Sequence, residues 1–120
     1  MKVVLVRTDR IGDLILSTPA IATVRRSFPG ARVTMICSSY NRIAMERNTD
    51  VDELVDVPPS VSPGAFGRRF RGCDLAIALA PLVSDLAIAG ATRAPVRAGY
   101  TYERRYLLRL TLRRFVNVLM

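Results

Sequence analysis

The chain has 120 residues, half of them hydrophobic, which suits one domain with a packed core and argues against wholesale disorder. Histidine is absent, which excludes a histidine-based catalytic triad, a histidine–cysteine zinc site and a histidine general base. The formal net charge is +8, and a basic surface of this kind attracts the phosphate groups of nucleic acid, anionic lipid or a phosphorylated sugar.

The first predicted element is a strand over residues 3–6, a continuous apolar and β-branched run that indicates burial on both faces. A helix is expected from about Asp13 to Phe28, where a Pro-Gly pair ends it. Pro19 interrupts this helix in one of two ways. Either Thr18 caps a new helix that has Pro19 at its first position, or Pro19 kinks one longer helix.

Strands and helices continue to alternate along the rest of the chain. Four further strands are expected at residues 33–37, 53–57, 74–79 and 96–100. Short helices are expected at residues 40–47, 66–70 and 84–90, the first capped by Ser38 and Ser39 and the last by Ser84. The strand at 53–57 alternates in polarity and belongs near an edge. This order predicts an α/β fold, a Rossmann-like doubly wound parallel sheet with helices on both faces.

The two cysteines and the absence of a long apolar segment predict a cytoplasmic protein. Cys37 and Cys73 lie in or beside apolar runs without metal-binding spacing, so buried free thiols are expected. The apolar run at 3–6 is too short for a signal peptide, and no window approaches the ~20 apolar residues that cross a bilayer.

A charged cluster, "RTDRIGD" at residues 7–13, follows the first strand. It falls at the carboxyl end of that strand, where ligands bind in open α/β sheets. The cluster has one glycine, Gly12, and two carboxylates that would repel a pyrophosphate, so a dinucleotide site is disfavoured; no P-loop motif occurs either. Asp13 stands at a helix N-terminus. It is either a helix cap or a general base that takes a proton from a substrate hydroxyl.

Three segments resemble the family 9 glycosyltransferases, the ADP-heptose:lipopolysaccharide heptosyltransferases and their relatives. The segment "MKVVLVRTDRIGDLILSTPAIATVRRSFPGARVTMICSS" has the strand, R-x-D-R-I-G-D, T-P-A and R-R-x-F-P-G-A pattern of their start. "RNTDVDELVDV" resembles their N-P-D-V-D-E segment, with Thr49 in place of the proline. "RGCDLAIALAPLVSDLAIAGATRAPVRAGY" resembles a later strand–helix–strand segment, so the resemblance covers nearly the whole chain.

The resemblance implies a GT-B enzyme, in which two Rossmann-like domains face each other across a cleft. The N-terminal domain holds the acceptor, the C-terminal domain holds the nucleotide sugar, and the anomeric centre is inverted in one displacement. The I-G-D aspartate, proposed as the base, matches Asp13. Its neighbours Thr8, Asp9, Arg10 and Gly12 are candidate substrate-binding residues. No metal or other cofactor is implied, and the sequence has no D-x-D motif.

The chain also departs from the family pattern. Ala78 replaces an acidic residue, and Ser84-Asp85 replace an Arg-Ser pair, which affects expected acceptor contacts. Family members are considerably longer. Residues 1–120 are therefore expected to form a single, incomplete acceptor-side domain that lacks the nucleotide-sugar domain and is inactive alone. It would serve transfer of a heptose-like sugar to a lipopolysaccharide-type acceptor. The alternative is a non-catalytic interaction or regulatory remnant of the family.

Two further basic segments invite opposite interpretations. Arg68, Arg69 and Arg71 in "GRRFRG" either bind phosphate or carboxylate groups of a lipid-linked acceptor sugar or form a solvated loop. The tail at 103–120 has apolar residues among five arginines and is either a peripheral contact with the inner face of the cytoplasmic membrane or a core element. Nucleic-acid binding is disfavoured, because no known binding module is present and the basic residues are not interleaved with aromatic ones.

Overall fold

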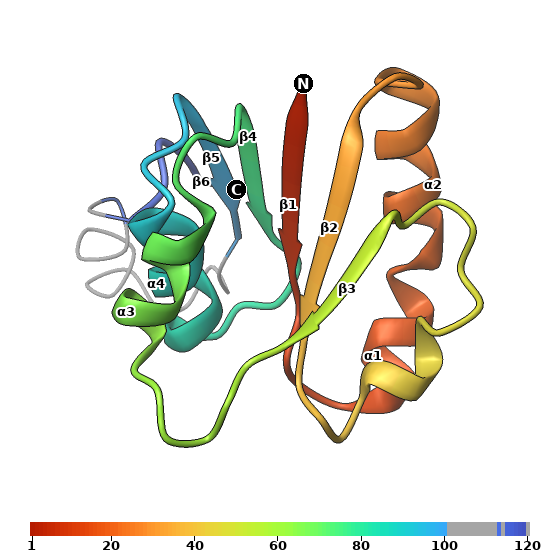
Figure 1. Cartoon of the computed structure of the whole chain (residues 1–120), viewed down its shortest axis with the longest axis horizontal. Coiled ribbons are helices and arrows are strands. Elements are labelled where there is room, and N and C mark those ends of the chain that lie inside the picture. The colour runs from red at the N-terminus through yellow and green to blue at the C-terminus, as the bar shows by residue number, and fades with distance from the viewer. Residues whose placement is uncertain (101–112, 114, 120) are drawn as a thin grey trace.

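The computed structural model describes residues 1–100, 113 and 115–119, which form one twisted sheet with helices on both faces (Figure 1). The six strands are parallel to one another and run in the order β3-β2-β1-β4-β5-β6. Their bounds are β1 Lys2–Val6, β2 Arg32–Cys37, β3 Glu53–Asp56, β4 Leu75–Ala78, β5 Val96–Gly99 and β6 Val118–Leu119. The predicted α/β fold with a doubly wound parallel sheet is confirmed.

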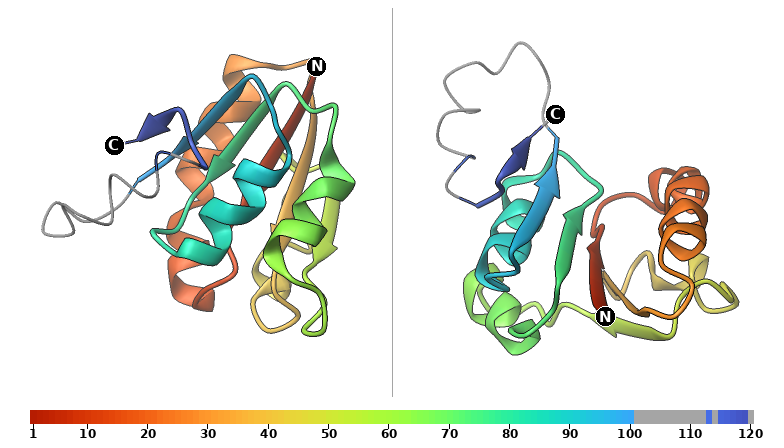
Figure 2. Two further views of the ribbon diagram at one scale, coloured as in Figure 1. Left: turned by 90° about the vertical axis from the view of Figure 1, so that its left-hand side faces the viewer. Right: turned by 90° about the horizontal axis from the view of Figure 1, so that it is seen from above.

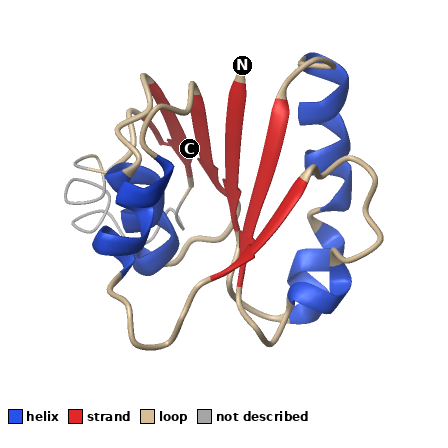
Figure 3. Ribbon diagram, in the orientation of Figure 1, coloured by secondary structure: helices blue, strands red, loops and turns tan. Residues whose placement is uncertain are grey.

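Helices cover the two faces of the sheet in separate groups (Figure 2). One face carries α1 (Ile11–Leu16), α2 (Thr18–Ser27) and the 3₁₀ turn η1 (Arg42–Ala44). The other carries α3 (Pro63–Gly67), the 3₁₀ turn η2 (Arg68–Phe70) and α4 (Val83–Ala91). Figure 3 shows the strands as a central layer between these two groups.

The alternate side chains of β1 point into two different cores. Val3 and Leu5 pack with Leu14 and Ile21 on the α1–α2 side, and all four are fully buried. Val4 and Val6 pack with Phe66, Leu86 and Ile88 on the α3–α4 side. Burial on both faces explains why β1 has a continuous apolar sequence rather than an alternating one.

The helix expected over residues 13–28 is two helices that meet at Ser17. Pro19 has no N–H to donate to the Ile15 carbonyl, and the Thr18 hydroxyl donates to that oxygen instead at 2.6 Å. Thr18 is the first residue of α2 rather than its cap, and the cap position belongs to Ser17. Because Ser17, which ends α1 and precedes α2, keeps a right-handed helical backbone conformation, the arrangement is close to the kinked-helix alternative.

Three other short helices differ from their predicted bounds. The helix expected at 40–47 is only η1, because Ser38 and Asn41 bond reciprocally and hold a tight turn. The helix expected at 66–70 begins earlier, at Pro63, because the Ser62 hydroxyl accepts from the Ala65 N–H. Ser84 lies inside α4, which begins one residue before it at Val83.

Other expectations concern the edges and the thiols. β3 is an edge strand, as predicted. β6 forms at residues 118–119 of the tail, and most of the 103–120 tail lies outside the described residues. Cys37 and Cys73 are free and buried, as predicted, and burial raises the pKa of the Cys37 thiol to about 12. Over the described part of the chain, no helix combines the length and apolarity needed to cross a membrane.

Candidate functional site

The candidate site is a cavity at the carboxyl ends of β1 and β4. Helix α1 begins at this edge of the sheet (Figure 1). β1 and β4 are neighbours, but β1 leads to α1 on one face and β4 leads to α4 on the other. This reversal is the place where open α/β sheets bind ligands. The cavity has a volume of about 440 Å³ and is lined by Arg7, Asp9, Arg10, Asp13, Pro81, Leu82 and Tyr100.

Arg7 organises the loop between β1 and α1. Its Nε and Nη2 donate to the two carboxylate oxygens of Asp9 at 2.8 and 3.0 Å. Its Nη1 donates to the Leu79 carbonyl and, at 3.1 Å, to the Ser17 hydroxyl. Burial alone would lower the pKa of Arg7, but its hydrogen bonds and attraction to Asp9 outweigh this effect and raise it. The guanidinium therefore acts as a fixed cross-link between the loop, β4 and the helix junction.

Asn41 holds the same loop from the α1 side of the sheet. Its side chain is fully buried, and Nδ2 donates to the carbonyl oxygens of Arg7 and Asp9 at 3.1 and 3.0 Å. Its Oδ1 accepts from the Ser38 N–H at 2.9 Å. Each polar atom of the buried amide thus has a partner, as burial requires.

Asp85 holds the loop from the opposite face. It lies in the first turn of α4 and is fully buried. Its carboxylate accepts from the Thr8 hydroxyl at 2.5 Å and from the Thr8 N–H at 3.0 Å. Burial raises the pKa of Asp85, and the two hydrogen bonds from Thr8 oppose that rise. Thr8, a candidate substrate-binding residue, directs its hydroxyl toward this contact.

Asp13 and Arg10 line the cavity beside this fixed loop. Asp13 is half-buried in the first turn of α1, and its carboxylate makes no hydrogen bond or ion pair with the residues that the structure describes. Arg10 is exposed and immediately precedes α1 without capping it through its side chain. A carboxylate that is accessible, unpartnered within this part of the chain and next to a cation can accept a proton from a bound hydroxyl.

Gly12 stands between Arg10 and Asp13, on the exposed side of α1. A Cβ added there would meet no other atom within 4 Å. The described fold therefore does not require glycine at this position, and a close approach of a ligand to the backbone is a physical reason to have it.

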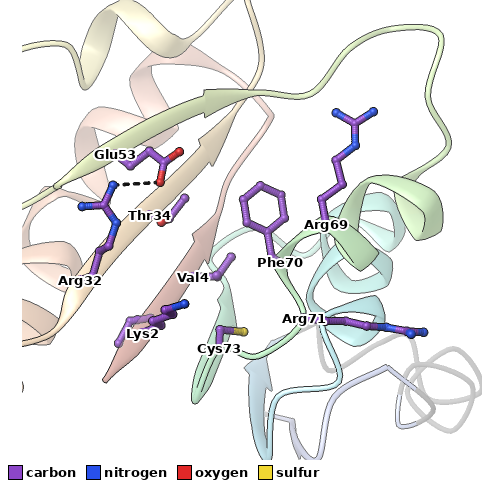
Figure 4. Close-up of a pocket in the computed structure, with 10 residues that line it drawn as sticks. Lys2, Val4, Arg32, Thr34, Glu53, Arg69, Phe70, Arg71 and Cys73 are labelled. Atoms are coloured by element: carbon purple, nitrogen blue, oxygen red, sulfur yellow. Dashed lines mark hydrogen bonds and ion pairs between the residues drawn. The ribbon is translucent and has the colours of Figure 1, made fainter.

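Arg69 and Arg71 lie at the opposite, amino edge of the sheet. Arg69 and Arg71 line a separate cavity of about 250 Å³ together with Lys2, Arg32 and the starts of the central strands (Figure 4). In Figure 4 their side chains turn away from Lys2 and Arg32. Arg68 lies over the α3–α4 side. The structure brings Thr8, Asp9, Arg10, Gly12 and Asp13 together but does not bring the three later arginines to them.

Sequence reasoning did not find two polar side chains that shape the site, Asn41 and Asp85. Asp85 gave a partial signal, since it stands where the resemblance predicted a serine. Asn41 gave none, because an isolated asparagine in a polar turn is ordinary. Both make contacts over long sequence separations. Asn41 contacts Arg7 and Asp9, which are 34 and 32 positions away, and Asp85 contacts Thr8, which is 77 positions away.

Comparison with solved structures finds proteins that share this fold. No protein-family model matches the sequence, and no curated protein matches it. A family 9 glycosyltransferase from Veillonella parvula superposes with a TM-score of 0.79 at 23% identity, over 99% of this chain and 35% of its own. The fold is that of a family 9 glycosyltransferase. This agrees with the resemblance drawn from the sequence.

Two E. coli enzymes support the same conclusion about the fold. ADP-heptose lipopolysaccharide heptosyltransferase II superposes with a TM-score of 0.77 at 20% identity, over 99% of this chain and 34% of its own. Heptosyltransferase WaaC with ADP gives 0.75 at 21% identity, over 100% and 40%. This chain therefore spans between about a third and two fifths of the length of the structures that it resembles.

Proposed function

We propose that this chain is the acceptor-binding domain of an inverting glycosyltransferase that moves a heptose-like sugar from a nucleotide sugar to a lipopolysaccharide-type acceptor. The observation that carries this proposal is the placement of Asp13. Its carboxylate faces a cavity at the carboxyl edge of the sheet, on a helix whose entry loop is fixed from both faces. The likeness in fold to two heptosyltransferases supports the class of sugar.

In this proposal Asp13 acts as the general base. Its carboxylate takes the proton of an acceptor hydroxyl while the hydroxyl oxygen forms a bond to the anomeric carbon of the donor. The bond from that carbon to the nucleotide diphosphate breaks, and the diphosphate leaves with the electron pair. Arg10 beside Asp13 suits an anionic group on the acceptor, because its guanidinium can bind a carboxylate or phosphate through two hydrogen bonds.

The remaining candidate residues have different roles in the proposal. Asp9 fixes Arg7, and Gly12 lets the acceptor approach the first turn of α1. Thr8 shapes the loop rather than touching substrate. Arg68, Arg69 and Arg71 contact distant anionic groups of a lipid-linked acceptor or lie in solvent. The acid–base step uses only side chains of this chain and involves no cofactor.

The proposal places the nucleotide sugar on a second domain, in whichever polypeptide that domain is encoded. The chain covers 35% and 40% of two of the glycosyltransferase structures, so the remaining part of each is long enough to form a second domain of similar size. A lipid-linked acceptor also brings the domain to the cytoplasmic face of a membrane as a peripheral contact. The competing proposal, a non-catalytic remnant that keeps the fold, predicts acceptor binding or partner binding without transfer.

The first test is an amide NMR titration of the 120-residue chain with deacylated, heptose-deficient lipopolysaccharide. We expect saturable shifts at residues 9–13. Shifts confined to the amino-edge arginines, or no shifts, would contradict the proposal. The second test mixes the chain with the separately expressed nucleotide-sugar half of E. coli heptosyltransferase WaaC and ADP-heptose. Transfer that Asp13→Asn abolishes supports the enzyme, whereas acceptor binding without transfer favours the remnant.

A further inference from the structure

The contact between Asp85 and Thr8 joins the candidate site to a helix on the far face of the sheet. Among the residues that the structure describes, Asp85 is the one acidic or basic side chain that is fully buried. Its hydrogen-bond donors are the hydroxyl and N–H of a single residue, Thr8. The two residues are 77 positions apart, so the contact exists only in the folded chain.

A buried carboxylate is unfavourable unless hydrogen bonds and nearby positive charge offset its desolvation. Asp85 has two such hydrogen bonds, and its place in the first turn of α4 puts it near the positive end of a nine-residue helix. Arg7 lies close enough to favour the anion, whereas Asp9 disfavours it. An apolar side chain would be enough to fill this buried position. A carboxylate here is therefore explained only by its hydrogen bonds, which fix the position of Thr8.

The position of Thr8 determines where the cavity residues lie. Only four residues separate the end of β1 at Val6 from the start of α1 at Ile11. In so short a connection, fixing Thr8 limits the positions open to Arg10, and Arg10 immediately precedes the helix turn that carries Asp13. Asn41 fixes the loop through carbonyl oxygens on the α1 side, and Asp85 fixes it through donors on the α4 side.

We infer that Asp85 is a positioning residue of the acceptor site: through Thr8 it holds the β1–α1 loop so that Arg10 and Asp13 face the cavity. The inference rests on the proposed function for its chemistry. The structural part of the inference is that Asp85 keeps the β1–α1 loop ordered, and this part depends only on the two hydrogen bonds from Thr8. The family resemblance gives a different expectation, because it treats Asp85 as a substitution that removes a contact with the acceptor.

The test compares three variants with the wild-type chain. Asp85→Leu keeps roughly the size of the side chain but has no acceptor atom, so both hydrogen bonds from Thr8 are lost; an amide at this position would not serve, because its nitrogen could donate to the Thr8 hydroxyl oxygen. Thr8→Ser keeps both donors and is the conservative control. Thr92→Val removes another buried hydroxyl just beyond the end of α4, bonded to the Ala89 carbonyl at 2.6 Å, and controls for a general loss of stability.

Two readouts separate positioning from stability. Amide hydrogen exchange should accelerate at residues 8–13 in Asp85→Leu but not in Thr8→Ser or Thr92→Val. The affinity for deacylated, heptose-deficient lipopolysaccharide should fall about 10- to 100-fold in Asp85→Leu, by analogy with the loss of a side chain that orients a metal ligand. Thr8→Ser should retain the wild-type affinity, and Thr92→Val should lower the midpoint of urea unfolding without changing the affinity.

Unchanged exchange at residues 8–13 in a folded Asp85→Leu variant would overturn the inference. An equal loss of affinity in Thr92→Val would also overturn it, because the effect would then follow stability alone. If Asp85→Leu does not fold, Thr8→Val keeps the carboxylate and one donor and decides by the same two readouts. If the wild-type chain does not bind the acceptor probe, the proposed function fails while the exchange readout still tests the role of Asp85.

Discussion

The two edges of the sheet carry charges in different ways. At the carboxyl edge, Arg7, Asp9 and Asp85 are largely or fully buried, and their hydrogen bonds join the β1–α1 loop to Ser17, to Leu79 after β4 and to α4. At the amino edge, the Arg32–Glu53 pair is 58% and 46% exposed, with its atoms 3.2 Å apart. The carboxyl edge therefore has a buried, hydrogen-bonded polar arrangement, whereas the amino edge has solvent-exposed charge.

This difference shows why charge in the sequence is a poor guide to a site. The densest basic run within the described residues, Arg68 to Arg71, lies away from the candidate site: Arg69 and Arg71 line the cavity at the amino edge, and Arg69 lies over the Phe66 ring at 5.4 Å. The sparser cluster at residues 7–13 falls at the topological switch. Strand order, more than the number of charges, decides which cluster meets a cavity suited to chemistry.

The largest expected effect is on catalysis, at the carboxyl edge. Asp13→Asn should lower the rate of sugar transfer about 100- to 10,000-fold in the reconstituted assay, because the amide cannot accept the hydroxyl proton. The matched variant at the amino edge, Arg69→Gln with Arg71→Gln, should leave the rate within a small factor of wild type. A larger loss in the double arginine variant would reverse the contrast between the edges.

The next effect is on stability. Asn41→Ala should lower the free energy of unfolding by about 1–3 kcal/mol, because the Arg7 and Asp9 carbonyls and the Ser38 N–H lose a buried partner. Glu53→Gln should change it by less than about 0.5 kcal/mol, since an exposed ion pair contributes little. Urea unfolding of the two variants measures both values. Equal losses would contradict the claim that only one edge is fixed.

Gly12→Ala should separate stability from binding within the carboxyl edge. The new methyl group meets no neighbour, and alanine favours the helix by roughly 0.5–1 kcal/mol, so the free energy of unfolding should rise slightly. The affinity for the acceptor probe should fall, because the methyl group occupies the space that the ligand needs. A variant that binds the probe as well as wild type would remove Gly12 from the proposed site.

The smallest effect is a pH dependence whose sign differs between two aspartates. Hydrogen bonds from the Val33 N–H and from Arg25 hold the pKa of Asp52 below its usual value of 3.8. Asp52 therefore stabilises the fold above that value, and the contribution is lost as the pH falls through its lowered pKa. Burial raises the pKa of Asp85, so its contribution is largest below 3.8 and is lost as the pH rises through its raised pKa.

Urea unfolding between pH 2 and 8 tests these signs. The difference between wild type and Asp52→Asn should shrink toward acid pH and reach only about 0.2–1 kcal/mol near neutrality, because the Asp52–Arg25 pair is partly exposed. The difference between wild type and Asp85→Asn should shift in the opposite direction with pH. The same slope for both variants would show that burial does not govern Asp85.

Periodicity predicted the strands well because each one is buried in a way that its sequence reflects. β1 is apolar throughout since two cores cover it, and β3 alternates since it lies at the edge. Short helices were harder, because one local hydrogen bond decides their bounds. The Ser62 hydroxyl starts α3, and the reciprocal bonds of Ser38 and Asn41 limit η1 to one turn.

The site was predictable only where its residues are contiguous. Residues 9–13 lie after the first strand, so the topology of a parallel sheet was enough to place Asp13 at the ligand-binding edge. The supporting side chains come from distant turns, and their roles depend on the three-dimensional packing of β4 and α4 against β1. Nothing in a single sequence indicates that Thr8 and Asp85 will meet.

The close packing of α3 on α4 has a consequence for anyone who redesigns this domain. A Cβ at Gly67 would collide with the Ile88 carbonyl and the Ala91 methyl group, so even alanine would push the two helices apart. Since α4 carries Asp85, a library that varies Gly67 would select against cavity-edge function as well as against folding. A protein engineer should therefore keep Gly67 unchanged together with the residues that face the acceptor.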